Sequence, residues 1–325
     1  MEVKLTDCYT LSEGKALMSG TEALVRLLLE QSRIDRLNGL RTKGLVSGYP
    51  GSPLGGLDIA LGKAKAFLDE EGIHFQPAVN EELAATALWG SQHINLYDNP
   101  DIQGVFSMWY GKGPGLDRAM DALRHANQGG VAPHGGMVIA VGDDPTGKSS
   151  TLAYQSDQNF HSLGIPYFFP KNVSDIIPMG LEAFALSRYS GCCVGLKIVV
   201  DTADSNAVVD MSKLRPSLPI LKPNNLVHVT KHDPASVRES KLHDVRLPAV
   251  QTWCENSENV AQVYLPAKKG ETRLGIIGVG KIANEVNEAL AGLLPDRDKK
   301  NTVAFTAINM PWPLPEKKIS TMLSV

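Results

Sequence analysis

The segment Ala78-Val-Asn-Glu-Glu-Leu-Ala-Ala-Thr-Ala-Leu-Trp-Gly90 starts with two acids and continues as a run of small and apolar residues. Asn80 is a favourable N-cap, and Glu81 and Glu82 would lie in the first turn, where free N–H groups and the helix dipole favour negative charge. Four residues share one face at helical spacing, which we expect to be buried: Leu83, Ala84, Ala87 and Leu88. A carboxylate at the start of such a helix can share a proton with a ligand nitrogen. The alternative is two acids that only stabilise the helix N-terminus, which is the commoner situation.

The sequence around this helix alternates between strand and helix patterns. Residues 1–20 read as an irregular lead-in, and Ser19-Gly-Thr-Glu22 predicts a capped helix that continues through the apolar run after it. Strands are predicted at 44–49, 102–110, 137–141, 166–169 and 194–200, and further helices at 57–68, 116–126 and 175–188. This alternation predicts an α/β fold with a mostly parallel, doubly wound sheet, in which ligands bind where the strands end at their carboxyl ends.

The pattern changes after about Asp201. Six prolines between positions 216 and 266 interrupt it, so we expect an extended connecting region over 203–270, with one helix near 234–241. A second unit follows, with a strand at 274–278, a helix at 284–293 and a strand at 302–307. Too few residues remain to close another sheet, so we expect a fragment, or a subunit that a partner completes.

Composition indicates an ordinary globular protein. The 325 residues include 32 basic and 35 acidic side chains, and a net charge of −3 gives no electrostatic case for nucleic-acid binding. The apolar runs are far shorter than the roughly 20 residues that span a bilayer, and the N-terminus lacks a signal-peptide pattern, so a cytoplasmic location is expected. Four cysteines lack CxxC spacing and predict neither a zinc nor an iron–sulfur site: Cys8, Cys192, Cys193 and Cys254.

The segment Gly142-Asp-Asp-Pro-Thr-Gly-Lys148-Ser149 matches the phosphate-binding pattern GxxxxGK[ST] and follows a predicted strand. It would place Lys148 on phosphates and Ser149 on magnesium, with Asp201 as a second magnesium ligand. The sequence after it is polar and poorly periodic, whereas a phosphate loop leads into a firm helix. Two acids inside the loop also oppose phosphate binding.

A second glycine motif, Gly278-Val-Gly-Lys-Ile-Ala283, has the GxGxxA form of a dinucleotide fingerprint between a strand and a helix. The next strand ends in Ala307-Ile-Asn309 and lacks the acid that binds ribose hydroxyls. Close packing of strand and helix is therefore the favoured interpretation.

Two rigid turns complete the predicted carboxyl edge. Gly48-Tyr-Pro-Gly-Ser-Pro-Leu-Gly-Gly56 combines prolines that fix the backbone with glycines that allow close approach, and it presents the Ser52 hydroxyl. Gly111-Lys-Gly-Pro-Gly115 repeats this arrangement after the next strand. Tyr110 and Lys112 there are candidates to contact an anionic substrate, although Lys112 on the surface is equally expected.

Four motifs in this order and spacing resemble a known family: Tyr49-Pro-Gly-Ser-Pro53, Asn80-Glu81 before the alanine-rich helix, Gly142-Asp-Asp-Pro145 with Ser149-Ser150, and Met310-Pro-Trp-Pro-Leu314. The chain resembles the thiamine-diphosphate-dependent 2-oxoacid:ferredoxin oxidoreductases, most closely the N-terminal part of indolepyruvate:ferredoxin oxidoreductase. The resemblance implies an aminopyrimidine-binding domain over 15–205, a linker over 206–270, and the beginning of a transketolase C-terminal-like domain over 271–325.

The resemblance also implies roles for individual residues. Glu81 would hydrogen-bond N1′ of the aminopyrimidine and so activate thiamine diphosphate, with Glu82 as the rival that the Asn-Glu register disfavours. The Tyr49-Pro50-Gly51 turn would line the cofactor site. Ser52, Tyr110 and Lys112 would contact a 2-oxo acid, and the Gly142–Ser150 segment would be a loop of the same domain, with Lys148 incidental.

In this family the complete enzyme oxidatively decarboxylates indolepyruvate or related 2-oxo acids, with coenzyme A taking the acyl group and iron–sulfur clusters passing electrons to ferredoxin. This sequence lacks the Gly-Asp-Gly and asparagine that hold the diphosphate through Mg²⁺, and it lacks a ferredoxin-like cysteine run. We therefore expect it to supply the aminopyrimidine half-site, to be inactive alone, and to form a homodimer or a complex with a chain that carries the diphosphate-binding domain. The alternatives are a phosphate-loop nucleotide hydrolase and a non-catalytic remnant that associates with an intact relative.

Overall fold

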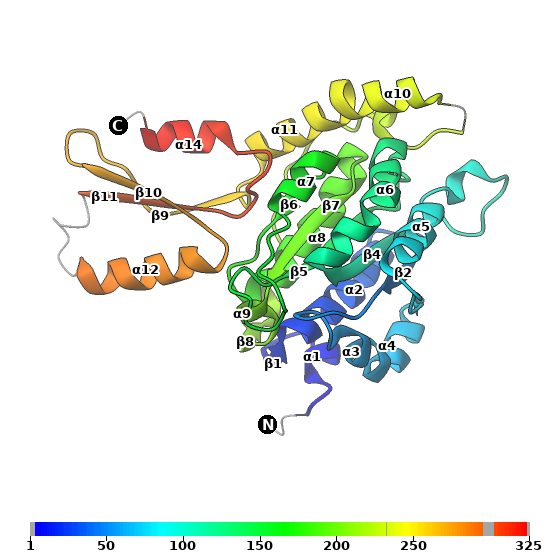
Figure 1. The fold of residues 1–325 in the computed structure, drawn as a ribbon, viewed down its shortest axis with the longest axis horizontal. Coiled ribbons are helices and arrows are strands. Elements are labelled where there is room, and N and C mark those ends of the chain that lie inside the picture. The colour runs from blue at the N-terminus through cyan, green and yellow to red at the C-terminus, as the bar shows by residue number, and fades with distance from the viewer. Residues whose placement is uncertain (1–3, 232, 295–301, 324–325) are drawn as a thin grey trace.

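A six-stranded parallel sheet forms the centre of the larger part of the chain (Figure 1). The computed structural model describes residues 4–231, 233–294 and 302–323. All neighbouring strands in this sheet run parallel. Their order across the sheet is β3 (Ile73–Phe75), β2 (Thr42–Gly48), β4 (Gly104–Lys112), β5 (Met137–Asp143), β7 (Val194–Val199) and β6 (Tyr167–Phe168). The predicted α/β fold with a mostly parallel sheet is confirmed, and the three-residue strand β3 was not predicted.

Helices cover both faces of this sheet, as a doubly wound fold requires. One face packs against α2 (Gly20–Leu37), α3 (Leu57–Lys63) and α8 (Val173–Ser190), and the other against α5 (Glu81–Ser91), α6 (Gly113–Gly129) and α7 (Asp157–Leu163). Strand β4 shows the alternation, because Phe106 and Met108 face the first layer and Trp109 faces the second. The single helix predicted over 57–68 is divided at Ala64 into α3 and α4 (Lys65–Glu70).

The N-terminal region is more ordered than the sequence predicts. The expected cap of α2 is present, since Ser19 and Glu22 form a capping box. Residues expected to be irregular instead form α1 (Asp7–Thr10) and β1 (Lys15–Ser19). Strand β1 pairs antiparallel with β8 (Asn206–Asp210), a partner almost 200 residues away that no local pattern can reveal.

The stretch expected to be an extended connection is largely helical towards its end. The predicted helix near 234–241 is present as α10 (Ala235–Ser240), but it continues through a π-helical turn, η4 (Lys241–Arg246), into α11 (Leu247–Asn256). The remaining short elements in the described chain are α9 (Val200–Ala203) and the 3₁₀ turns η1 (Ile94–Leu96), η2 (Met211–Lys213) and η3 (Asn225–Val227).

A smaller three-stranded sheet follows, in the order β10 (Leu274–Val279), β11 (Val303–Ile308) and β9 (Ala261–Leu265). Strands β10 and β11 are parallel and are connected across α12 (Lys281–Leu293), while β9 pairs antiparallel with β11. Helix α14 (Glu316–Leu323) lies on the opposite side of this sheet from α12 (Figure 1). Strand β9 lies before residue 271, so the smaller sheet includes part of the expected connection.

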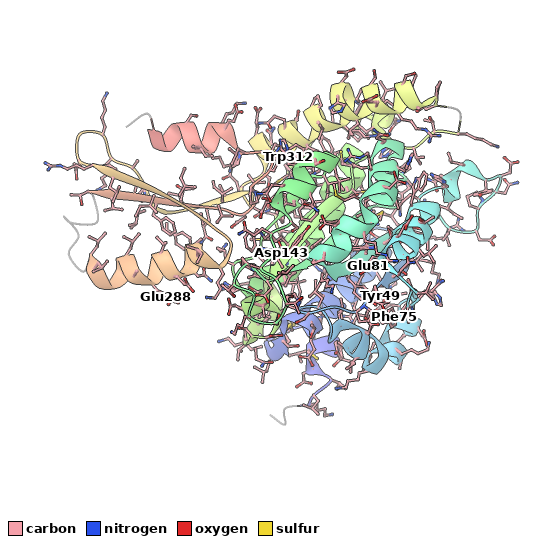
Figure 2. All side chains as sticks on the ribbon, viewed as in Figure 1. Tyr49, Phe75, Glu81, Asp143, Glu288 and Trp312 are labelled. Carbon is pink, nitrogen blue, oxygen red and sulfur yellow. The ribbon has the colours of Figure 1, made fainter. Side chains whose placement is uncertain are left out.

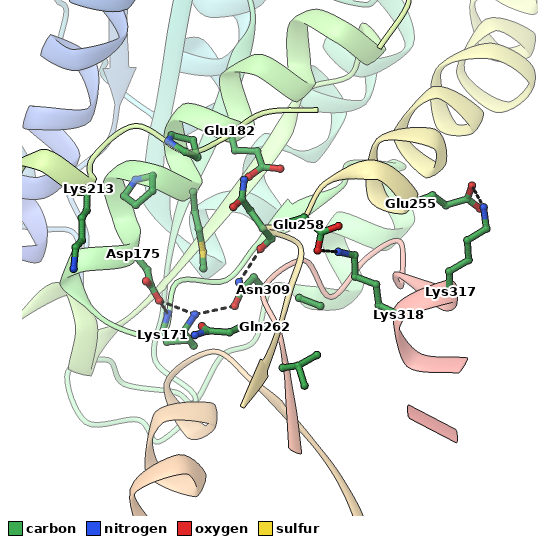
Figure 3. A pocket seen from close by; sticks show the side chains of 16 residues that line it. Lys171, Asp175, Glu182, Lys213, Glu255, Glu258, Gln262, Asn309, Lys317 and Lys318 are labelled. Carbon is green, nitrogen blue, oxygen red and sulfur yellow. Dashed lines mark hydrogen bonds and ion pairs between the residues drawn. The ribbon is translucent and has the colours of Figure 1, made fainter. Parts of the chain in front are cut away.

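The smaller sheet is joined to the first unit by buried polar contacts. The Lys171 ammonium donates over 3.0 Å to Oδ1 of Asn309, which directly follows β11. On α8, Glu182 Oε1 accepts from Trp253 Nε1 on α11 over 2.9 Å. Between α8 and the smaller sheet lies a cavity of about 790 Å³, with Lys171, Glu182 and Asn309 in its wall (Figure 3).

No helix in the described part of the chain is long and apolar enough to cross a membrane. Over the same residues, no group of three or more His, Cys, Asp or Glu side chains is arranged to hold a metal ion.

Candidate active site

Three connections meet at the carboxyl edge of the parallel sheet: the bend after β2, the junction of β4 with α6, and the loop after β5. The bend is tied to β4 because the Tyr49 N–H donates to the Tyr110 carbonyl over 3.2 Å. The chain that enters α5 crosses the same edge, where the Ala78 N–H donates to the Gly48 carbonyl over 3.3 Å. Tyr49, Phe75 and Glu81 therefore lie on the side of the sheet where β2 ends (Figure 2).

Helix α5 begins as the sequence predicts. The Asn80 side chain accepts from the Leu83 N–H over 2.8 Å and caps the helix. The buried face differs from the predicted one: Ala84, Ala85 and Leu88 are buried, whereas Leu83 is 51% exposed and Ala87 is also exposed. The helix is rotated relative to the prediction because its first turn packs against β4 and α6.

Glu81 lies in a closely packed position at the start of this helix. The residue is only 6% exposed, and the Trp109 indole N–H donates to its backbone carbonyl over 3.0 Å. Glu82, the rival in the sequence, is exposed on the outer side of the same turn. The burial of the two acids therefore agrees with the preference for Glu81.

The carboxylate of Glu81 packs on the first turn of α6. A Cβ atom built on Gly115 would lie 2.9 Å from Glu81 Oε1, so the missing side chain at 115 provides the space for the carboxylate. No hydrogen bond reaches either carboxylate oxygen from the described residues, and the one cation within 4.0 Å is Arg118, whose Nε lies 3.8 Å from Oε2. A nearly buried carboxylate without a hydrogen-bond donor is available to a ligand that brings an N–H group. The sequence did not indicate Arg118, because it lies 37 positions from Glu81 in no recognised motif.

The bend after β2 lies over the ends of β4 and β5. A Cβ atom on Gly51 would lie 2.9 Å from Lys112 Cδ, and the Ser150 hydroxyl donates to the Ser52 carbonyl over 3.5 Å. Tyr49 and Pro50 are exposed, and Ser52 is half-buried. The structure thus brings the predicted residues of this bend to one edge of the sheet.

Lys112 and Tyr110, the two candidate substrate contacts on β4, lie in different surroundings. Lys112 is half-buried at the start of α6, its ammonium makes no ion pair with the described residues, and its stem packs on the bend. Tyr110 is fully buried on the face covered by α2, α3 and α8, where burial raises the pKa of its hydroxyl and Asp58 lies beside it. The alternation along β4 places Tyr110 in the core layer opposite to Trp109, and its expected contact with substrate stays a prediction.

The loop that matches the phosphate-binding pattern is folded around its own acid. Asp144 accepts from the N–H groups of Lys148, Ser149 and Ser150 over 2.9, 2.5 and 2.9 Å. Desolvation opposes ionisation of Asp144, but these hydrogen bonds outweigh it and lower its pKa to about 2. The N–H groups that would cradle a phosphate already donate to Asp144, and Lys148 pairs with Asp201 over 3.3 Å. The next helix after the loop begins only at Asp157, so the geometry does not support a nucleotide site.

Asp143, the last residue of β5, is a second buried carboxylate beside α6. Its Oδ2 accepts from the N–H and hydroxyl of Ser156 over 2.8 and 2.7 Å, and the Lys197 ammonium lies 3.4 Å away. Its Oδ1 has no hydrogen-bond partner in the described chain and would lie 2.8 Å from a Cβ on Gly113. Burial raises the pKa of Asp143, and the charge of Lys197 opposes that shift. The first turn of α6 is therefore bordered by two carboxylates, Glu81 at Gly115 and Asp143 at Gly113.

The second glycine motif serves packing, as the sequence interpretation favoured. A Cβ on Gly278 would lie 3.0 Å from Ala283 Cα and from the Phe305 ring, and a Cβ on Gly280 would lie 2.5 Å from the Phe169 ring. These glycines therefore allow other residues of the protein to pack closely against the backbone.

Comparison with known proteins agrees with this arrangement. The chain is 26% identical to the indolepyruvate oxidoreductase subunit IorA of Pyrococcus abyssi and 25% identical to that of Pyrococcus horikoshii, in each case over 96% of this chain and 44% of the relative. It therefore spans less than half the length of the curated relatives that it matches. No family model matches the chain.

Among solved structures, the 2-oxoglutarate:ferredoxin oxidoreductase of Magnetococcus marinus, with 2-oxoglutarate, coenzyme A and succinyl-CoA bound, is similar in fold. Its TM-score is 0.62 at 16% identity, and the match covers 96% of this chain and 56% of the other. These comparisons confirm the resemblance to the thiamine-diphosphate-dependent 2-oxoacid:ferredoxin oxidoreductases and the fold that it implies.

Proposed function

We propose that this chain supplies the aminopyrimidine half of a thiamine-diphosphate site in a 2-oxoacid:ferredoxin oxidoreductase. The observation that carries the proposal is the Glu81 carboxylate, which is nearly buried, receives no hydrogen bond from the described residues and is packed on Gly115. A ring nitrogen that shares a proton with this carboxylate would satisfy it. The relatives are subunits of indolepyruvate oxidoreductases, so a 2-oxo acid is the proposed substrate class and indolepyruvate its first candidate.

The residues present at this edge fit an aminopyrimidine. Glu81 offers an acceptor at the start of α5, where the first-turn N–H groups of the helix stabilise its charge. The exposed ring of Tyr49 and the Pro50-Gly51 bend lie at the same edge of the sheet and offer a surface on which a flat ring can lie. When bound, thiamine diphosphate supplies a thiazolium ring that stabilises the carbanion left after loss of carbon dioxide.

The roles proposed for this chain are binding, orientation and proton holding. Glu81 holds a proton at its carboxylate and so sets the protonation of the bound ring. Lys112, a half-buried cation without an ion pair among the described residues, is proposed to attract the carboxylate of a 2-oxo acid. Ser52 is proposed as a neighbouring polar contact to the same substrate.

The remaining parts of the reaction are proposed to lie outside this chain. Among the described residues, no group of three or more His, Cys, Asp or Glu side chains is arranged to hold a metal ion, and the sequence has no cysteine run for an iron–sulfur centre. We therefore propose that the Mg²⁺-diphosphate site, the iron–sulfur clusters, coenzyme A binding and contact with ferredoxin belong to further segments or partner chains, in a homodimer or a larger complex. A cytoplasmic location accompanies this proposal.

The test compares Glu81→Gln with Glu82→Gln in the protein purified with its partner subunits. Both variants remove one negative charge from the same helical turn, but only Glu81 is buried. We expect Glu81→Gln to lower 2-oxo-acid-dependent ferredoxin reduction at least 100-fold and to weaken binding of thiamine diphosphate, with Glu82→Gln within about two-fold of wild type. Near-normal activity and cofactor binding in Glu81→Gln would show that the assignment is wrong.

A further inference from the structure

Arg118 forms the one ion pair of Glu81 in the described part of the chain. Its Nε lies 3.8 Å from Glu81 Oε2, and it belongs to α6, one turn after Gly115. The two partners differ in exposure, since the Arg118 side chain is 61% exposed and that of Glu81 is 8% exposed. A largely exposed cation therefore lies beside a nearly buried carboxylate.

The two carboxylate oxygens face different neighbours. Oε1 packs on Gly115, where backbone limits access, whereas Oε2 faces the guanidinium. Other charged groups nearby include Glu82, exposed on the same helix, Lys112 at the start of α6, and Asp143, which borders the same turn at Gly113. None of these forms an ion pair with Glu81. Access to the carboxylate from solvent thus involves Arg118.

This arrangement creates competition for Glu81. A neighbouring cation favours the fully ionised carboxylate and disfavours a proton shared with a ligand. A ring nitrogen that hydrogen-bonds Glu81 must share the carboxylate with the guanidinium or displace it. Displacement costs little, because ion pairs with an exposed arginine are weak. A replacement partner is the exposed Asp121, which lies three residues along the same helix and whose Oδ1 is 3.9 Å from His125 Nε2.

We propose that Arg118 is a gating residue that occupies Glu81 before the cofactor binds and leaves it when the aminopyrimidine arrives. The inference rests on the proposed function, because it assumes that Glu81 receives this ring. It assigns Arg118 a negative effect on cofactor affinity, although a cation beside an anionic cofactor is ordinarily expected to increase affinity.

The test is an equilibrium titration of thiamine diphosphate and Mg²⁺ into the protein purified with its partner subunits, followed by calorimetry. Arg118→Gln removes the charge, and Arg118→Lys keeps it on a flexible stem. Arg124→Gln is the matched control, since Arg124 lies on the same helix but bonds to Ser162 instead. We expect Arg118→Gln to bind the cofactor about two- to five-fold more tightly, the range that a surface ion pair supplies, with Arg118→Lys and Arg124→Gln close to wild type.

Two results would overturn the inference and leave the proposed function standing: unchanged or weaker binding in Arg118→Gln, or equally tight binding in Arg118→Lys, which would mean that the charge is not responsible. Failure of the proposed function has a different signature. In that case the wild-type complex binds no cofactor, or Glu81→Gln binds it as tightly as wild type.

Discussion

The carboxylate of Glu81 occupies the space that a side chain at Gly115 would fill. A Cβ atom at 115 would lie 2.9 Å from both Cγ and Oε1 of Glu81, closer than real Cβ contacts allow. Helix α5, which carries the acid, and helix α6, which carries the glycine, are thus packed so that one residue's missing side chain sets the position of the other's functional group. The Gly-Lys-Gly-Pro-Gly segment is in this respect part of the Glu81 site.

Gly115→Ala should separate the position of Glu81 from the stability of the protein. Alanine favours a helix by about 1 kcal/mol over glycine, so we expect the thermal midpoint to stay unchanged or rise slightly. The new methyl group displaces the Glu81 side chain, and a shift of about 1 Å at a reacting group can cost on the order of 100-fold in rate. We expect cofactor affinity and 2-oxo acid oxidation to fall 10- to 100-fold, measured by calorimetry and by ferredoxin reduction.

Gly90→Ala is the control for this change. Gly90 lies on α5, and a Cβ atom there would have no neighbour within 4 Å. The same substitution should therefore leave binding and rate unaltered. Full activity in Gly115→Ala would indicate that the close contact with Glu81 has no functional role.

Elements that rest on local signals were predictable from the sequence, and those that rest on distant pairing were not. The capping box at Ser19 and the cap at Asn80 are encoded within three residues of each helix start, and the strands of the parallel sheet are continuous apolar runs. Strand β1 has no such run, and its order depends on pairing with β8. The π-helical turn η4 likewise depends on what its last residue contacts, which the sequence does not show.

In the candidate site too, features that rest on adjacent residues were predictable, and contacts between distant elements were not. Glu81 stood out because a cap, an acid and a small-residue helix are adjacent in sequence, and the resemblance to the family then implied its role. The contact of Glu81 with Arg118 depends on how α5 packs on α6, and the burial of Tyr110 depends on which face of β4 it occupies. Neither relationship has a sequence signal, so the sequence indicated neither the contact with Arg118 nor the burial of Tyr110.

Asp144→Asn should loosen the loop after β5. The amide replaces one acceptor oxygen by a donor that faces N–H groups of Ser149 and Ser150. We expect faster tryptic cleavage after Lys148 than in wild type. The pKa of Asp144 is lowered to about 2 from 3.8, so its stabilising effect is complete above pH 3.8 and disappears as the pH falls through 2.

The difference in thermal midpoint between wild type and Asp144→Asn should consequently be constant above about pH 5 and shrink towards pH 2. Asp98→Asn, at an exposed position, serves as the control and should change neither measurement. A difference that does not depend on pH would mean that the charge of Asp144 does not organise the loop.

The thermal midpoint of the Glu182→Gln variant, relative to that of wild type, should rise with pH. Burial raises the pKa of Glu182, and hydrogen bonds from Ser257 and Trp253 oppose that shift only in part. An acid whose pKa is raised on folding contributes stability below its unfolded pKa of 4.5 and loses it as the pH rises towards the folded value. The thermal midpoint of Glu182→Gln minus that of wild type should therefore increase between pH 4.5 and pH 8.

Glu258→Gln tests whether this trend is specific to burial. Glu258 lines the same cavity, but its side chain is exposed and pairs with Lys318 over 2.9 Å. Its midpoint difference should stay nearly flat with pH. Parallel trends in the two variants would attribute the effect to net charge instead of to the buried position of Glu182.

Arg246 caps the end of α6 opposite to the Glu81 site. Its buried guanidinium donates to the carbonyls of Gln128 and Gly129 over 2.7 and 3.1 Å and to that of Val227 over 2.6 Å. A cation at a helix C-terminus satisfies carbonyls that have no partner within the helix and is stabilised by the helix dipole. Burial lowers the pKa of Arg246, and no carboxylate in the described chain pairs with it, so the helix end serves as its counterpart.

Arg246→Met should therefore destabilise the whole first unit, because methionine fills much of the volume but leaves these carbonyls buried without donors. We expect a loss of about 3 kcal/mol, at 1–3 kcal/mol per unsatisfied buried group with partial rearrangement, and a thermal midpoint roughly 5–10 °C lower. Arg246→Lys should recover part of the loss, since one ammonium can reach some of the carbonyls. Arg238→Met, at a half-buried residue on α10 whose Nε donates to the Asp233 carbonyl over 3.0 Å, should cost only about 1 kcal/mol. Calorimetric unfolding of the three variants measures this order, and an Arg246→Met protein as stable as Arg238→Met would show that the cap contributes little to holding α6.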